Sequence, residues 1–153
     1  MKLTPSKINT FNLFKLPSAY FSGVRVKTID DFQCTVNVKH KWINQNPFKS
    51  IFWAVQGMAA ELTTGALVMA KIKSSGENIS MLVANNNATF TKKATGRISF
   101  ECHEGLKVDK AIEDAIKTGE GQTVWMNAIG VNEDGIQVSS FNFEWYLKVK
   151  RKK

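Results

Sequence analysis

The chain has 153 residues, which is long enough for one domain with a substantial apolar core. Its 43% apolar and 22% charged residues are typical of a globular protein and exclude a low-complexity chain. The formal charge of +8 at pH 7 predicts attraction to anions, whether nucleic acid, anionic lipid or the phosphates of coenzyme A, without choosing among them.

Part of the positive charge lies in the basic C-terminal segment 148–153, KVKRKK. The two cysteines, Cys34 and Cys102, lack metal-ligand spacing and alternate with polar neighbours, so we expect buried, reduced thiols and no metal or cofactor. The first residues, MKLTPSKINTF, have no long apolar run after their lysine. We therefore expect no signal peptide and a cytoplasmic protein.

Apolar residues at helical spacing predict a short amphipathic helix over residues 5–16, with a further turn closing at Gly23. Two alternating segments, 24–29 and 32–40, then predict a β-hairpin that turns at two aspartates. We expect four side chains of the second strand to share one face: Phe32, Cys34, Val36 and Val38.

The next segment, Asn46 to Ala70, predicts a long helix with Ser50 or Asn46 as its N-cap. It is apolar nearly all round and carries a single acid, Glu61. Leaving Glu61 ionised in such surroundings costs several kcal/mol unless a partner is present. Glu61 is therefore either a satisfied structural acid or a catalytic one.

The length of this helix also raises the alternative of a membrane span, which takes roughly 20 apolar residues. Gln56, Glu61 and two threonines lie inside it, and an ionisable group is costly in lipid. We therefore expect a helix enclosed by its own domain and no membrane span.

The second half of the chain predicts strands over 79–93 and 97–104, a helix over 107–117 and a final hairpin. The hairpin turns at Glu133-Asp134-Gly135. One face of the last strand should hold Phe141, Phe143, Trp145, Leu147 and Val149. This order predicts a single α+β domain over 1–153, with a curved antiparallel sheet wrapped around one long central helix.

That order resembles the hotdog fold. The residues are similar to the thioesterase branch related to the phenylacetate-pathway acyl-CoA thioesterases, and closest to its divergent, DUF4442-like relatives. In that branch an Asn precedes a His-Gly-Gly at the helix start, and an acid follows nine residues after the His. Here Asn46 lies six residues before Phe52 and Glu61 nine after it, whereas Phe52-Trp53-Ala54 replaces the His-Gly-Gly. Residues 88–103 also resemble the strand–turn–strand stretch of the family.

The resemblance implies an acyl-CoA thioesterase, and the residues suggest how it would work. Glu61 would be the base or nucleophile, Asn46 would orient the thioester or the water, and Thr64 lies within reach of Glu61. The backbone amides of Trp53 and Ala54 would bind the oxyanion at the positive end of the helix. The phosphates of coenzyme A would meet three basic residues: Lys92, Lys93 and Arg97.

Distance along the helix predicts a shared site. Glu61 lies 11 residues after Ser50, about 16 Å along a helix axis, so one carbonyl cannot touch both. We therefore expect the site to form between two subunits of a homodimer or of a dimer of dimers. The resemblance implies the same.

Alternatives remain for each residue and for the whole protein. Glu61 could be a structural acid bonded to Thr64 or to a backbone N–H, Asn46 could be only a cap, and the basic residues could be ordinary surface charges. Because Phe52 and Trp53 are bulky, the protein could be a non-catalytic one that binds acyl groups or acyl-CoA without hydrolysis. A third hypothesis, binding of nucleic acid or anionic membrane through Lys150 to Lys153, ranks below both, and we expect no nucleic-acid partner.

Overall fold

The computed structural model describes residues 2–151, so Met1 and the last two lysines of the basic segment 148–153 lie outside the described residues. Six strands and four α-helices follow one another along this part of the chain. In chain order the elements are α1 (Pro5–Lys15), α2 (Pro17–Phe21), β1 (Arg25–Ile29), β2 (Cys34–Lys39), the 3-10 turn η1 (Trp42–Asn44), α3 (Trp53–Ser75), β3 (Ile79–Phe90), β4 (Arg97–Cys102), α4 (Gly105–Thr118), β5 (Gln122–Val131) and β6 (Gln137–Val149).

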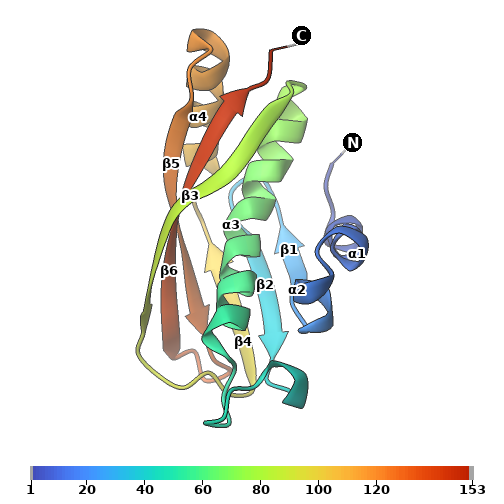
Figure 1. Ribbon diagram of the computed structural model, residues 1–153, viewed down its shortest axis with the longest axis vertical. Helices are drawn as coiled ribbons and strands as arrows, with labels where there is room; N and C mark the ends of the chain where they lie inside the picture. Colours follow the sequence, from blue (N-terminus) through green and yellow to red (C-terminus); the bar gives the residue numbers. More distant parts are fainter. Residues whose placement is uncertain (1, 152–153) are drawn as a thin grey trace.

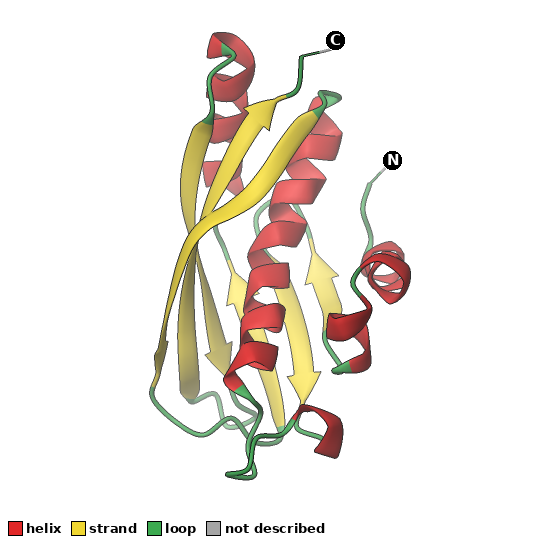
Figure 2. Cartoon of the chain, viewed as in Figure 1, coloured by secondary structure: helices red, strands yellow, loops and turns green. Residues whose placement is uncertain are grey.

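The six strands form one antiparallel sheet in the order β1-β2-β4-β5-β6-β3. The sheet curves around α3, which runs along its concave side (Figure 1). The helices α1 and α2 lie beside β1, and α4 lies near the end of the sheet where β6 finishes (Figure 2). The predicted α+β class, with a curved antiparallel sheet around one long helix, is confirmed.

The core lies between α3 and the inner face of the sheet. Val55, Ala59, Leu62 and Ala66 of α3 are all buried. The predicted inner face of the last strand is confirmed, because four of its five side chains are buried and Val149 packs against the core. None of the helices within residues 2–151 is long and apolar enough to cross a membrane.

The inner face of β2 differs from the prediction at one residue. Cys34, Val36 and Val38 are buried as expected, but Phe32 is 58% exposed. The Asp30 carboxylate accepts hydrogen bonds from the backbone N–H groups of Phe32 and Gln33. These bonds hold Phe32 in the turn, so the strand begins two residues later.

The N-cap of the long helix was also predicted wrongly. The helix begins at Trp53, and its N-cap is Phe52 rather than Ser50 or Asn46. The Asn46 side chain instead closes a turn with Ser50, and the Phe52 N–H donates to the Asn44 carbonyl. Local side-chain bonding within the loop therefore delays the start of the helix.

The two cysteines, distant in sequence, are direct partners across β2 and β4. Both are buried and free. Burial raises the pKa of the Cys34 thiol to about 12 and that of Cys102 to about 11. Neither therefore offers a thiolate at neutral pH.

A close backbone contact positions α4. Gly105, its first residue, lies against the turn between β1 and β2, and a Cβ atom at this position would overlap the carbonyl oxygen of Asp31. The Gly105 N–H donates to the Phe32 carbonyl in the same turn. Position 105 therefore requires glycine because the Asp31 backbone leaves no room for a Cβ atom, although glycine is a weak helix former.

We predict that Gly105→Ala lowers the free energy of unfolding by about 1–3 kcal/mol, because the added methyl group forces the backbones apart. Helix propensity alone predicts the opposite sign. Gly57→Ala is the matched control, since its added Cβ would lie 3.6 Å from the Phe141 ring, an ordinary contact. Denaturant unfolding of both variants measures the difference, and equal stability would contradict the contact argument.

Candidate functional site

The loop that precedes α3 is held in place by a buried asparagine. The Asn44 side chain accepts from the Lys41 N–H at 2.8 Å and donates to the carbonyls of Ser22 and Lys39 at 2.9 and 2.8 Å. These bonds fix residues 40–52 to α2 and β2, although most of them lack regular structure. Sequence reasoning missed Asn44, because its partners are distant in the chain.

Asn46 organises the next part of the loop. Its Oδ1 accepts from the N–H groups of Phe48 and Ser50 at 2.9 and 3.2 Å, and its Nδ2 donates to the Ser50 hydroxyl at 2.9 Å. The Asn46 side chain is therefore committed to local bonds within this chain, as a turn-forming asparagine is.

The start of α3 leaves two backbone donors free. The first internal bonds of the helix run from Val55 and Gln56 to the Phe52 carbonyl. Within residues 2–151, the N–H groups of Trp53 and Ala54 have no acceptor. Free amides at the positive end of a helix dipole are suited to a developing oxyanion.

A pocket of about 420 Å³ lies beside this helix start. It brings together four residues predicted from the sequence, Asn46, Trp53, Lys92 and Lys93, and the Lys93 ammonium also donates to the Phe48 carbonyl at 3.4 Å. Arg97 does not line it. The full lining is Asn46, Phe48, Ser50, Ile51, Trp53, Gln56, Phe90, Lys92, Lys93 and Ala94.

Gln56 is the polar group of this pocket that the sequence prediction did not include. Its side chain is 4% exposed, and its Nε2 donates to the Ile51 carbonyl at 3.2 Å. Its Oε1 is buried and has no hydrogen-bond partner among the residues described. A buried acceptor without a partner is costly, so a ligand or water that donates to it would be stabilised. The sequence signal was a glutamine in an otherwise apolar run.

Glu61 lies about two turns along α3 from Trp53 and is partly buried. Its carboxylate forms no hydrogen bond or ion pair with any described residue, and burial raises the pKa of Glu61 above its usual value of 4.5. Thr64 is fully buried, and its hydroxyl donates to the Glu61 backbone carbonyl at 3.0 Å, not to the carboxylate. The alternative in which Thr64 satisfies the acid is therefore wrong.

Trp145 of β6 completes the surroundings of Glu61. Its Nε1 donates to the Thr64 hydroxyl at 2.9 Å, so Thr64 links the helix to the sheet. The indole packs on Gly65, where an added Cβ would lie 3.0 Å from the ring and 3.8 Å from the Glu61 carboxylate. Thr64 and Trp145 thus define one wall beside the acid.

The two halves of the candidate site lie apart within one chain. Glu61 follows Trp53 by eight residues, about 12 Å along the axis, which is shorter than the distance expected for a helix that starts at Ser50. Glu61 does not line the pocket at Asn46. A single chain therefore does not bring the acid to the free amides.

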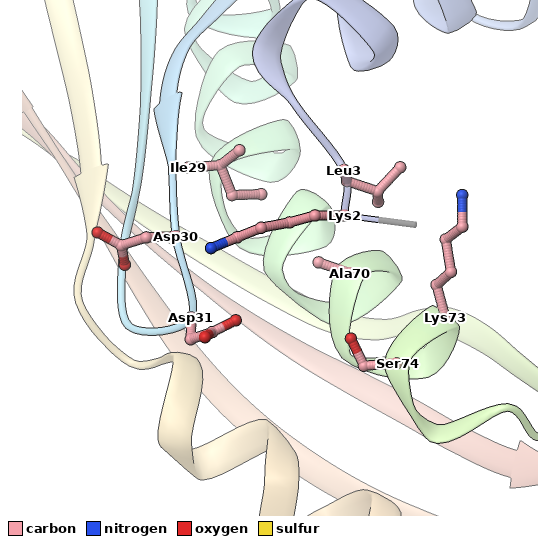
Figure 3. Close-up of a pocket in the computed structure, with 8 residues that line it drawn as sticks. All are labelled: Lys2, Leu3, Ile29, Asp30, Asp31, Ala70, Lys73 and Ser74. Atoms are coloured by element: carbon pink, nitrogen blue, oxygen red, sulfur yellow. The ribbon is translucent and has the colours of Figure 1, made fainter.

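A second cavity, of about 260 Å³, lies near the C-terminal end of α3. Figure 3 shows Lys2 extended across it toward Asp30 and Asp31, with Lys73 and Ser74 on the helix side. The pKa of Asp30 is lowered by hydrogen bonds from the Phe32 and Gln33 backbone, which suits a turn residue. Across residues 2–151 there is no cluster of His, Cys, Asp or Glu that could hold a metal.

The sequence model of a family described as "Domain of unknown function (DUF4442)" matches residues 8–147. No curated protein matches the chain.

Solved structures are similar over nearly the whole chain. A protein of unknown function from Pseudomonas aeruginosa, called a probable thioesterase, has a TM-score of 0.82 at 18% identity and covers 98% of this chain and 99% of its own. A protein of unknown function from Chlorobaculum tepidum has a TM-score of 0.83 at 17% identity, and the match covers 97% of this chain and 99% of that protein. A thioesterase from Haemophilus influenzae has a TM-score of 0.71 at 12% identity, and the match covers 97% of this chain and 93% of that protein. The likeness shows that the chain shares the fold of these proteins, the hotdog fold that the sequence predicted.

We predict that Asn46→Ala lowers the free energy of unfolding by about 1–2 kcal/mol, because the Ser50 N–H loses its acceptor. Asn46→Asp keeps that acceptor and should stay within about 0.5 kcal/mol of the wild type. Denaturant unfolding of the two variants tests this. Equal losses in both would show that the amide donor, rather than the acceptor, holds the loop.

Proposed function

The chain belongs to the DUF4442 family, and from this premise we propose that it is an acyl-thioester hydrolase whose active site is completed by a second copy. One observation carries the proposal: Glu61 is a partly buried acid without a partner among the described residues, and its pKa is raised by burial. A structural acid in such surroundings would have a partner, because an unpaired charge is costly. A catalytic base gains from both features.

In the proposed mechanism, the thioester oxygen accepts hydrogen bonds from the Trp53 and Ala54 amides of one subunit. The Glu61 carboxylate of the other subunit takes a proton from water, and the resulting hydroxide attacks the carbonyl carbon. The tetrahedral oxyanion collapses with cleavage of the carbon–sulfur bond, and the thiolate takes the proton from Glu61. In the nucleophilic alternative, the Glu61 carboxylate attacks the carbonyl carbon and expels the thiolate, and water then hydrolyses the acyl–glutamate anhydride to release the acid and restore Glu61.

The other residues have supporting roles in this proposal. Asn46 shapes the loop beside the reacting carbonyl, and Thr64 positions the backbone of Glu61. Lys92 and Lys93 at the pocket, with Arg97 nearby in the sequence, would meet the phosphates of coenzyme A. The buried Oε1 of Gln56 would accept from a substrate N–H or from a water, which satisfies its missing bond.

Pairing of two chains is supported by the edge strand β3. It is 12 residues long, contains no charged side chain and has β6 as its only neighbour in the sheet. Long uncharged edge strands readily pair with another chain, and natural proteins otherwise blunt them with charge or proline. We propose that two β3 strands meet in a homodimer, and that a dimer of dimers is compatible with this.

The proposal includes the class of substrate and the place in the cell where the protein acts. An acyl-CoA substrate fits the lysines at the pocket, an acyl carrier protein is the alternative carrier, and kinship to the phenylacetate-pathway branch would favour a coenzyme A thioester. A single domain acting in the cytoplasm without a cofactor completes the proposal.

A second candidate is an acyl-CoA binding protein without hydrolysis. It is favoured by Phe52 and Trp53, which are 44% and 59% exposed at the helix start and stand where the family that the sequence resembles has His-Gly. Thiol release from a panel of acyl-CoAs of increasing length separates the two. Turnover supports hydrolysis, and tight binding without turnover supports the binding protein.

We predict that Glu61→Gln lowers kcat/KM by about 10²–10⁴-fold, because the base or nucleophile is lost. In the wild type, kcat/KM should rise as the pH passes the raised pKa of Glu61. The acid limb of the pH–activity profile should therefore lie above pH 4.5. Thiol release over a range of pH measures both. An acid limb that is identical in wild type and variant would contradict the assignment.

Glu61→Gln should also raise the free energy of unfolding at neutral pH. The folded state binds the Glu61 proton more tightly than the unfolded state, so this acid costs stability as the pH rises through the two pKa values. Below the unfolded pKa the difference between wild type and variant should vanish. Glu77→Gln, at an exposed position just after α3, is the control and should change stability at neither pH.

We predict that two inactive variants restore each other when mixed. Trp53→Pro removes one oxyanion donor and should lower kcat by about 10²–10³-fold. Proline fits here, because it would be the first helical residue and Phe52 before it is extended, with φ −58° and ψ 134°. Trp53→Ala keeps the backbone N–H and is the matched control, so it should retain more activity than Trp53→Pro.

Refolding Trp53→Pro together with Glu61→Gln should recover about a quarter of the wild-type activity, because random pairing makes about half of the dimers mixed, each with one intact site. No recovery, although the mixed dimer forms, would place both groups of a site in one chain.

A further inference from the structure

One end of the molecule exposes aromatic and aliphatic side chains. The loop before α3, the loop between β3 and β4 and the turn between β5 and β6 all lie at this end (Figure 1). Hydrogen bonds join them: His40 N–H to the Gly96 carbonyl at 2.8 Å, and Arg97 N–H to the Glu133 carboxylate at 2.7 Å. These bonds hold three connections of the chain together as one surface.

Trp42 is the most exposed large apolar side chain of residues 2–151, at 85%. Phe48 is 70% exposed and Ile43 56%, and both lie in the same loop. Phe21 of α2, 61% exposed, is close by, because Asn44 binds the adjacent Ser22 carbonyl. Clustered exposure of this kind marks an interaction surface rather than scattered surface residues.

The loops 40–52 and 91–96, which carry or adjoin these side chains, hold lysines and no acid. The exposed lysines of the same loops form no ion pair with any described residue, and the acids of the adjoining turn between β5 and β6 are Glu133 and Asp134. We name this surface the loop tip and define it by the apolar residues Phe21, Trp42, Ile43 and Phe48 and the lysines Lys39, Lys41, Lys49, Lys92 and Lys93.

We propose that the loop tip docks on the surface of an anionic lipid bilayer. Tryptophan and other amphipathic or apolar side chains are favoured at the boundary between headgroups and acyl chains. Lysines beside them are attracted to anionic headgroups, and their long aliphatic stems let the ammonium groups reach outward. The loop tip provides both kinds of group in one place.

A second copy of the chain fits this surface less well. A two-fold contact through the loop tip would bring five lysines of one copy next to five of the other, against the two acids of each adjoining turn, Glu133 and Asp134. An anionic bilayer supplies the opposite charge. Phe48, Lys92 and Lys93 of the loop tip also line the pocket at Asn46, whereas Trp42 and Ile43 do not, so variants of Trp42 and Ile43 test docking apart from the proposed hydrolysis.

The basic C-terminal segment is a separate region. The last strand, β6, ends at the opposite end of the molecule from the loop tip (Figure 1). Lys148, Lys150 and Arg151 line a hollow there with Ser80 and Glu120, without an exposed aromatic side chain. Binding through the loop tip and binding through this segment therefore require different residues.

Co-sedimentation of the full chain with vesicles tests the proposal. The vesicles are phosphatidylcholine alone or with about a third phosphatidylserine, at low and physiological salt. We expect binding to the anionic vesicles that weakens as salt rises, and little binding to neutral ones. No binding to the anionic vesicles would overturn the proposal.

Two double variants locate the binding surface. Trp42→Ser with Ile43→Ser should weaken binding by about tenfold or more, because the apolar anchors are lost. Lys39→Glu with Lys41→Glu should weaken it by at least about tenfold through charge reversal. Trp125→Ser and Lys117→Glu change exposed residues outside the loop tip and should bind as the wild type does.

Other outcomes would assign the binding elsewhere. If removal of Lys150 to Lys153 abolishes binding and the Trp42/Ile43 variant binds normally, the C-terminal segment is the lipid contact and the proposal is overturned. If light scattering gives a lower molar mass for the Trp42/Ile43 variant than for the wild type, and the wild type does not bind vesicles, the loop tip is a contact between copies and the proposal is overturned. Circular dichroism and thermal unfolding confirm that the variants are folded.

Discussion

Enclosure of α3 is the constraint on which the rest of the structure depends. From Val55 to Val68 the helix is buried on most of its circumference, so no amphipathic arrangement on a flat sheet would cover it. The sheet must curve, and its inner faces supply the aromatic and aliphatic side chains that surround the helix. Every polar group that lies inside this enclosure then needs either a partner or a reason to lack one.

Four polar side chains of α3 illustrate both cases. Thr63 donates to the Ala59 carbonyl, and Thr64 joins the helix to Trp145, so both are satisfied. Gln56 and Glu61 each retain an oxygen without a partner in the part of the chain described. One lies at the pocket and the other beside the helix face that contacts β6. The unsatisfied groups thus coincide with the two halves of the candidate site.

The sequence predicted the fold well because burial repeats with the period of each element. Alternation in β6 identified its inner face, and the long apolar run identified α3. Phe32 and the start of α3 were missed because side-chain bonds to the backbone, from Asp30 and Asn46, overrode the pattern. Asn44 and Gln56 were missed as functional residues because what matters about them is a distant partner or the lack of one. The roles predicted for Asn46 and Glu61 came from a resemblance in spacing to a known family and, for Glu61, from its place as the one acid of an apolar helix, and those roles stay predictions.

The contact between Trp145 and α3 has an optical consequence. The indole is buried, cannot rotate while its Nε1 is bonded to Thr64, and packs on Gly65 close to the Glu61 carboxylate. Indole emission responds to the charge of a neighbouring group and to the water around it. The protein therefore contains an intrinsic fluorophore at the wall of its candidate site, whose signal changes when Glu61 gains or loses its proton or when a ligand displaces water there.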